Sequence, residues 1–104
     1  MTAGVSALVV DLVDRSRFPE GVAFVRRPDR IDGEAAVVVV DLGVAGALDA
    51  VRSLRTAGST AWIVGYGRHT EGDLLREARQ AGCDRVLARS AFFADVAAAL
   101  ATIR

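Results

Sequence analysis

The chain lacks lysine: all 13 of its basic residues are arginine. A mechanism that needs a lysine, either as a nucleophile or as a compact point charge, is therefore excluded. The arginines balance 13 acidic residues, so the formal net charge is zero, and the two signs are interleaved along the chain. Binding to nucleic acid or to an anionic membrane depends on a basic excess. We therefore expect neither kind of partner.

Cysteine and long apolar runs are equally scarce. The single Cys83 has no partner for an internal disulfide, which suits a reducing compartment. It follows Gly82 at an expected helix end, so we interpret it as a small core residue. The longest unbroken apolar run is about six residues, far short of the ~20 needed to span a bilayer, and residues 1–4 carry no basic leader. We expect a cytoplasmic protein.

The remaining composition is that of an ordinary globular protein. The chain has 104 residues, of which 52% are apolar and 25% are charged. This length is sufficient for one hydrophobic core and too short for two, and the apolar content argues against disorder. We therefore expect a single domain over residues 1–104.

The stretch around which the sequence is organised is the run of four valines at 37–40, which leads directly into Asp41. A short, β-branched apolar run is typical of a strand buried on both faces, as in the centre of a parallel sheet covered by helices. Functional crevices in such sheets lie at the carboxyl ends of the strands. Asp41 is therefore the first candidate for chemistry.

Strand and helix patterns alternate along the rest of the chain. Leu48, Val51 and Leu54 show the helical spacing well, and Gly58 provides a stop. Thr70 is the expected N-cap of a later helix. The link at 26–35 is too short for a helical crossover, so we expect a loop or a single turn there. The expected strands are 5–10, 21–25, 37–40, 61–64 and 85–88, and the expected helices are 12–18, 47–57, 70–82 and 91–103.

This alternation predicts an α/β fold with a five-stranded parallel sheet and right-handed crossovers. Five strands in about 100 residues favour the flavodoxin-like order 2-1-3-4-5, with a shortened first helix and a second helix that is short or absent. In that order the first and third strands are neighbours. Asp11 and Asp41, which follow them, should converge in an acidic pocket.

At this point the chain resembles the receiver domain of bacterial two-component response regulators, over nearly its whole length. The resemblance is carried by Val9-Val10-Asp11, by Val39-Val40-Asp41-Leu42 and by the segment from Ala78 to Leu87. It implies that Asp41 takes the position of the phospho-accepting aspartate. It also implies that Asp11 takes the first of two consecutive acidic positions that help to hold magnesium.

The departures from the family fall where its chemistry occurs. Leu12 stands in place of the second acidic residue, which removes an oxygen ligand for magnesium. Gly65 stands in place of the hydroxyl residue that ends the fourth strand. Arg89, followed by Ser90, stands in place of the lysine and proline after the fifth strand, and arginine lacks the compact charge of an ammonium. These switch-position replacements suggest a degenerate member, or pseudo-receiver.

Two interpretations of Asp41 follow. It is either a phosphoacceptor or a structural, vestigial acid, and in the second case it caps the following loop or, as we hypothesise, pairs with Arg89. We favour a non-enzymatic signalling module that acts by protein contacts, without a cofactor and with impaired or lost phosphorylation. The alternative is a phosphorylatable receiver that uses Asp41, and only this alternative implies magnesium, at Asp11 and Asp41.

The most unusual segment is a glycine-containing loop that precedes the expected helix at 70–82. Two glycines, a cation and a helix start can hold an anion, so a small-molecule or anion-binding domain is a third candidate. A flexible turn or a partner contact are the other interpretations. His69 has no second His or Cys at ligand spacing, so we expect no metal there. The segment comprises Gly65, Tyr66, Gly67, Arg68, His69 and Thr70.

Adjacent Phe92 and Phe93 cannot both be buried on one narrow helix face. The resemblance implies that partners or a homodimer dock on the last two helices and the last strand, and it would place one of these phenylalanines near Leu75 and Tyr66 on that surface. Packing beneath a loop is the alternative.

Overall fold

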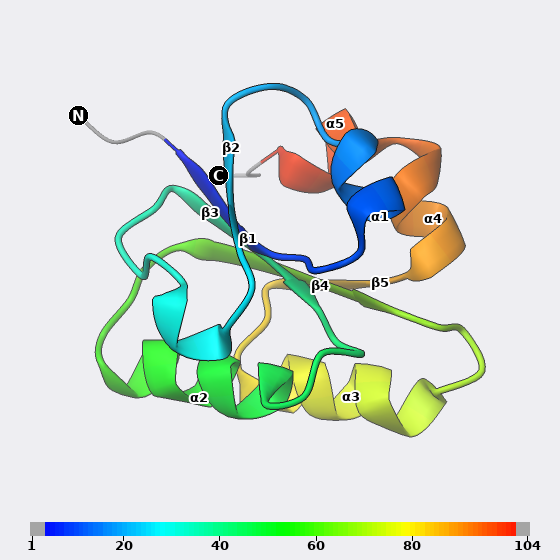
Figure 1. The fold of residues 1–104 in the computed structure, drawn as a ribbon. Helices are drawn as coiled ribbons and strands as arrows, with labels where there is room; N and C mark the ends of the chain where they lie inside the picture. Colours follow the sequence, from blue (N-terminus) through cyan, green and yellow to red (C-terminus); the bar gives the residue numbers. More distant parts are fainter. Residues whose placement is uncertain (1–3, 102–104) are drawn as a thin grey trace.

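A computed structural model describes residues 4–101 and shows a five-stranded, fully parallel sheet of order β2-β1-β3-β4-β5 (Figure 1). No helix in this described range is long and apolar enough to cross a membrane. The elements are β1 (Val5–Leu8), α1 (Leu12–Ser16), β2 (Val22–Val25), the 3-10 turn η1 (Pro28–Arg30), β3 (Val37–Asp41), α2 (Ala47–Thr56), β4 (Trp62–Gly67), α3 (Gly72–Ala81), β5 (Arg85–Ala88), α4 (Arg89–Ala94) and α5 (Val96–Leu100).

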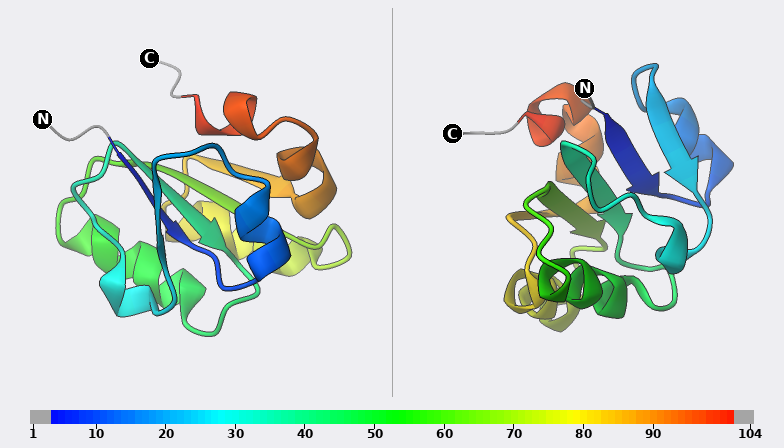
Figure 2. Two further views of the ribbon diagram at one scale, coloured as in Figure 1. Left: turned by 45° about the horizontal axis from the view of Figure 1, so that its top comes forward. Right: turned by 90° about the vertical axis from the view of Figure 1, so that its left-hand side faces the viewer.

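The sheet is covered on both sides. α2, α3 and η1 lie against one face, and α1, α4 and α5 lie against the other (Figures 1 and 2). The flavodoxin-like fold class and strand order are confirmed, as are the shortened first helix and the single turn between β2 and β3. β2 lies at one edge of the sheet, next to β1.

The valine run forms the centre of the core. Val38 and Val40 join the cluster beneath α2 and α3, whereas Val37 and Val39 join the cluster beneath α1, α4 and α5. All four are buried, because successive side chains of a strand point to opposite faces and both faces are covered. Asp41, the last residue of β3, is only partly buried.

Several predicted boundaries were wrong. β1 ends at Leu8, and β4 continues through Gly67 instead of stopping before Gly65. The last helix is interrupted at Asp95, whose side-chain Oδ1 caps α5 by accepting a hydrogen bond from the Ala98 amide at 3.0 Å. The N-cap of α3 is Glu71, not Thr70. The expected end of the last helix, at residue 103, lies outside the described residues.

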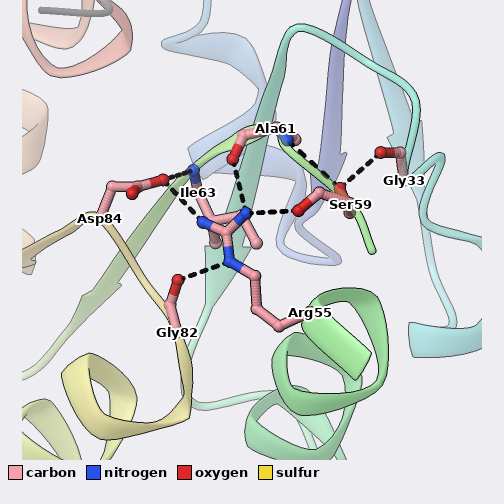
Figure 3. Close-up of polar contacts among 7 residues, drawn as sticks. All are labelled: Gly33, Arg55, Ser59, Ala61, Ile63, Gly82 and Asp84. Carbon is pink, nitrogen blue, oxygen red and sulfur yellow. Dashed lines mark hydrogen bonds and ion pairs between the residues drawn. The ribbon is translucent and has the colours of Figure 1, made fainter. Parts of the chain in front are cut away.

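Arg55 ties together the loops at the amino ends of β4 and β5 (Figure 3). Its Nε donates to the carbonyl of Gly82 at 2.9 Å, and its Nη1 donates to the carbonyls of Ser59 and Ala61, also at 2.9 Å. Its Nη2 pairs with Asp84 at 2.7 Å. Asp84 in turn accepts the Ile63 amide at 2.8 Å. This Arg55 clamp fixes the end of the sheet that lies opposite the predicted crevice.

Candidate functional site

A cleft of about 680 Å³ opens at the carboxyl ends of the strands. We call it the carboxyl-end cleft. β1, β3, β4 and β5 all lead into it, so it lies where the parallel topology predicts a functional crevice. Its charged lining consists of four carboxylates and two guanidiniums, namely Asp11, Asp14, Asp41, Glu71, Arg68 and Arg89. Asp11 and Asp41 therefore meet at one cleft, as their strand positions predicted.

Asp41 is half-buried at the end of β3. Its Oδ1 accepts a hydrogen bond from the Gly43 amide at 2.9 Å, which turns the chain away from the strand. Burial raises the pKa of the Asp41 carboxyl, and the neighbouring Asp14 and Asp11 charges raise it further. The Gly43 amide and the Arg89 charge oppose these effects and lower the pKa. Ionised Asp41 is thus held in surroundings that disfavour its charge.

Asp11 is the N-cap of α1. Its Oδ1 accepts from the amides of Val13 at 2.8 Å and Asp14 at 3.1 Å, which satisfies two of the free donors of the helix start. The next residue, Leu12, is 69% exposed. Asp11 therefore has a local structural role at the rim of the cleft.

The centre of the site is a residue that sequence reasoning missed. Asp14 is fully buried, and both of its carboxylate oxygens are bound by Arg89. Arg89 Nη1 donates to Oδ2 at 2.6 Å, and Nη2 donates to Oδ1. The Tyr66 hydroxyl also donates to Oδ2, at 3.3 Å. This Asp14–Arg89–Tyr66 network joins α1, α4 and β4, and a paired fork of this kind is the strong form of an arginine–carboxylate bond.

Aromatic rings hold the network in place. Tyr66 is buried and stacks on Phe92, with ring centroids 4.7 Å apart. The Arg89 guanidinium lies 5.1 Å from the centroid of Phe93, within cation–π range. Burial raises the pKa of the Tyr66 hydroxyl far above its ordinary value, so it acts as a neutral donor. The hydrogen bond with Asp14 raises the pKa of Arg89, which keeps its charge.

The hypothesis that Asp41 pairs with Arg89 is wrong. Both Arg89 Nη atoms are bound to Asp14, and no ion pair joins Arg89 to Asp41. Asp14 binds Arg89 from α1, whereas Asp41 accepts the Gly43 amide of its own loop. The sequence gives no sign that Asp14 is buried. By residue type, Leu12 and Val13 are expected on the buried side of α1 and Asp14 on its exposed side.

In the strand register, Tyr66 and not Gly65 is the β4 residue that lies beside Asp41. Asp41 lies beside Tyr66, while Gly65 lies beside Val40. Gly65 faces the α2 and α3 side, where an added Cβ would come within 3.2 Å of Leu42 and 3.3 Å of Cys83. Gly65 is therefore a packing glycine, and Tyr66 is the β4 residue that reaches the cleft. The interpretation of Cys83 as a core residue is confirmed, and burial raises the pKa of its thiol to about 11.

The expected anion loop does not form as predicted. Gly65, Tyr66 and Gly67 are buried residues of β4, so their amides belong to the sheet and are not arranged around a ligand. Only the segment from Arg68 to Thr70 is an exposed turn, and Arg68 alone of these three lines the cleft. Among residues 4–101 no group of three or more His, Cys, Asp or Glu side chains is arranged to hold a metal, His69 included.

The residues expected on a shared docking surface are divided between the two faces of the sheet. Tyr66 and Phe92 are buried in the cluster beneath α1, α4 and α5, and Phe93 packs against it half-buried. Leu75 packs against the other cluster, beneath α2 and α3. The expectation that one phenylalanine joins Tyr66 and Leu75 on one surface was therefore wrong.

No protein-family model matches the chain, and no curated protein sequence matches it significantly. These two comparisons therefore assign the chain to no family.

Proposed function

We propose that this chain is a receiver-like signalling module that works through protein contacts, and that its phosphorylation chemistry is lost. The observation that carries the proposal is the bond between Arg89 and buried Asp14. Arg89 occupies the position where the resemblance implies a phosphate-binding lysine. The Asp14 carboxylate already binds both Nη atoms of Arg89, which a phosphoryl group on Asp41 would need as donors.

Charge in the cleft supports this proposal. Phosphoryl transfer depends almost entirely on positive charge placed around the transferred group. Here four carboxylates face two guanidiniums, and one of the guanidiniums is neutralised by Asp14. Phosphorylation of Asp41 would add further negative charge beside Asp11 and Asp14, which already raise the pKa of Asp41.

The donors for magnesium are also incomplete. Leu12 replaces one carboxylate, and Asp14 is bound to Arg89, so only Asp11 and Asp41 have oxygens to offer from the positions that the family uses. Magnesium needs near-octahedral oxygen coordination and would depend mainly on water there. The residues present therefore do not fit a receiver's magnesium site.

The proposal is tested by incubating the chain with acetyl phosphate and magnesium and measuring its intact mass. A phosphorylatable receiver treated in parallel is the positive control, and Asp41→Asn is the negative control. We expect no added phosphoryl group on the wild-type chain. A mass increase of one phosphoryl group that Asp41→Asn abolishes would establish the alternative, a phosphorylatable receiver.

The shared cleft of Asp11 and Asp41 is the observation that favours that alternative. The anion-binding alternative has less support, because the glycines of its loop are part of β4. A cytoplasmic location belongs to the proposal as well, since the buried, unpaired Cys83 suits a reducing compartment.

A further inference from the structure

One edge of the sheet presents an unpartnered strand. β2 lies at the rim (Figure 2, right), and β1 is the only described helix or strand that packs extensively against it. Every second residue of an edge strand points its N–H and C=O groups away from the sheet. Apart from the ladder with β1, no backbone–backbone hydrogen bond of the described residues involves residues 19–26. The outward backbone groups of β2 are therefore open to an added strand.

The two ends of β2 carry opposite charges. Glu20 precedes the strand and Arg26 follows it, and both side chains are exposed. Neither forms an ion pair with another described residue. A strand with an anion at its start and a cation at its end is complementary to an antiparallel copy of itself, because each charge then lies beside the opposite charge of the other copy.

The geometry of antiparallel pairing selects the register. Residues directly opposite each other in such a ladder both point their backbone groups toward the partner or both point them away. Because this direction alternates along a strand, a strand that pairs with its own copy must oppose residues whose numbers are both odd or both even. The register centred on Ala23 meets this condition and brings the Glu20 end of each strand to the Arg26 end of the other. It places the small, exposed Ala23 on the two-fold axis and Val22 opposite Phe24, a β-branched–aromatic pair that stabilises such ladders.

The opposite edge of the sheet lacks this complementarity. β5 is flanked by Asp84 and Arg89, but Asp84 is paired with Arg55 and Arg89 is paired with Asp14. The charges at the ends of β5 are therefore used within the chain, whereas those at the ends of β2 remain for a second copy. Since the net charge is zero, two whole chains do not repel each other as they approach.

We propose that two copies of the chain pair through β2, in antiparallel orientation about a two-fold axis at Ala23, and join their five-stranded sheets into one. The assembly stops at two copies, because the same edge serves both partners. The strand has four residues, and the flanking Pro19 and Pro28 keep the pairing short, so we expect a weak dimer with a Kd of about 100 μM.

Pairing through β2 goes beyond the proposed function, since it requires neither the carboxyl-end cleft nor any chemistry at Asp41. The surface is also distinct from the last two helices and the last strand, where the resemblance places partners.

The first test measures the oligomeric state of the whole chain by analytical ultracentrifugation at low salt, from about 10 μM to about 1 mM. We expect a reversible equilibrium between monomer and dimer. Glu20→Arg or Arg26→Glu should each weaken the dimer about tenfold or more, because like charges then meet at both ends of the ladder. The matched controls are Glu77→Arg and Arg79→Glu on α3, which change exposed residues without a described ion pair and should leave the dimer unchanged.

Exchange of the two charges separates pairing through β2 from a general effect of charge. The double variant that combines Glu20→Arg with Arg26→Glu should restore the dimer. A mixture of the two single variants should form a heterodimer more readily than either variant pairs with itself, because one copy then carries two cations at the ends of β2 and the other carries two anions. Failure of both rescues would overturn the proposed pairing.

Position 23 provides a test that does not depend on charge. Ala23→Cys places a thiol on the two-fold axis, where opposed Cα atoms of an antiparallel ladder are about 4.5–5.5 Å apart, within the range of a disulfide. Mild oxidation should therefore link two copies of this variant, and it should not link Glu77→Cys. The native Cys83 is buried and does not compete.

A chain that stays monomeric up to about 1 mM would overturn the proposed pairing. So would a dimer that is insensitive to the changes at Glu20 and Arg26, or cross-linking at position 23 that is no faster than at position 77, since the copies would then meet on another surface. The acetyl phosphate test measures the mass of the chain and not its association, so either proposal can fail without the other.

Discussion

Two arginines hold the two ends of the same sheet, and they do so with different partners. Arg55 donates to three backbone carbonyls and one carboxylate at the amino ends of β4 and β5 (Figure 3). Arg89 gives both of its Nη atoms to one buried side chain, Asp14, at the carboxyl ends. The first arrangement fixes loops, because the backbone groups are present whatever the side chains are. The second depends on one residue, so a single substitution can remove it.

The two arginines also differ in their position relative to the carboxyl-end cleft. The Arg55 clamp lies away from the carboxyl-end cleft and includes Gly82, whose φ of 128° and whose contact with the Arg55 side chain leave no room for a Cβ. The Asp14–Arg89–Tyr66 network lines the cleft beside Asp41. At this edge of the sheet the Arg89 guanidinium is already bound by a carboxylate of the same chain, Asp14. Its Nη atoms are therefore not free to bind an external anion.

The largest expected effect is that of Arg89→Met, which leaves Asp14 charged and buried without a counter-ion. Removing one partner of a fully buried pair costs about 3–5 kcal/mol. Asp14 is fully buried but the Arg89 side chain is 41% exposed, so we expect a loss toward the lower end of this range. Chemical denaturation should show a loss of stability in this range. The matched control is Arg52→Met, which breaks an exposed pair with Asp49 and should change stability by less than about 1 kcal/mol. Equal effects of the two substitutions would show that the Asp14 pair is not special.

Arg55→Ala should rank next, with a loss of about 2–3 kcal/mol. It removes four hydrogen bonds, but the side chains of Arg55 and Asp84 are 25% and 35% exposed, so water can reach part of the clamp. Arg55→Lys should recover less than half of the loss, because one ammonium cannot match the directions of four acceptors. If Arg55→Lys recovered all of the lost stability, the ion pair with Asp84 alone would account for the effect of Arg55, and the three bonds to backbone carbonyls would not be needed.

Tyr66→Phe should have a smaller effect, a loss of about 0.5–1 kcal/mol. It removes one long hydrogen bond to Asp14 and leaves the stack on Phe92. In the Arg89→Met background the same change should cost more, because the hydroxyl is then the remaining side-chain donor to Asp14. Equal costs in the two backgrounds, measured by denaturation, would indicate that Tyr66 and Arg89 do not act on the same carboxylate.

Asp41→Asn should be nearly neutral or slightly stabilising at pH 7. The folded state raises the pKa of Asp41, so it binds the proton more readily than the unfolded chain does. Ionisation of Asp41 therefore lowers stability as the pH rises from the ordinary pKa of 3.8 through the raised value. The gain from Asp41→Asn should appear above this window and vanish below it, while the asparagine still accepts from Gly43. A loss of stability at pH 7 would contradict the assignment.

The order of the elements could be predicted from the sequence because alternating strand and helix patterns permit few topologies. The valine run identified the central strand, and the short link at 26–35 excluded a crossover helix. The interruption at Asp95 was missed, although an aspartate three residues before Ala98 is a typical cap. It lay within an alanine-rich stretch that looks continuously helical.

The site was predicted less completely, for two physical reasons. A strand alternates its faces, so ending β4 three residues early assigned the cleft position to Gly65 when Tyr66 occupies it. The five-residue α1 is too short for its own periodicity to determine its burial. Its orientation is set by Arg89, which lies 75 residues away in sequence. Local sequence therefore carried no sign that Asp14 is buried while Leu12 and Val13 are exposed.

The central claim is that Arg89 serves Asp14 and not Asp41, and two double-mutant cycles measure this directly. Each combines Arg89→Met with either Asp14→Asn or Asp41→Asn, and compares unfolding free energies at pH 7. We predict a coupling of about 2 kcal/mol or more between Arg89 and Asp14, and of less than about 0.5 kcal/mol between Arg89 and Asp41. A coupling to Asp41 that equals or exceeds the coupling to Asp14 would contradict the claim.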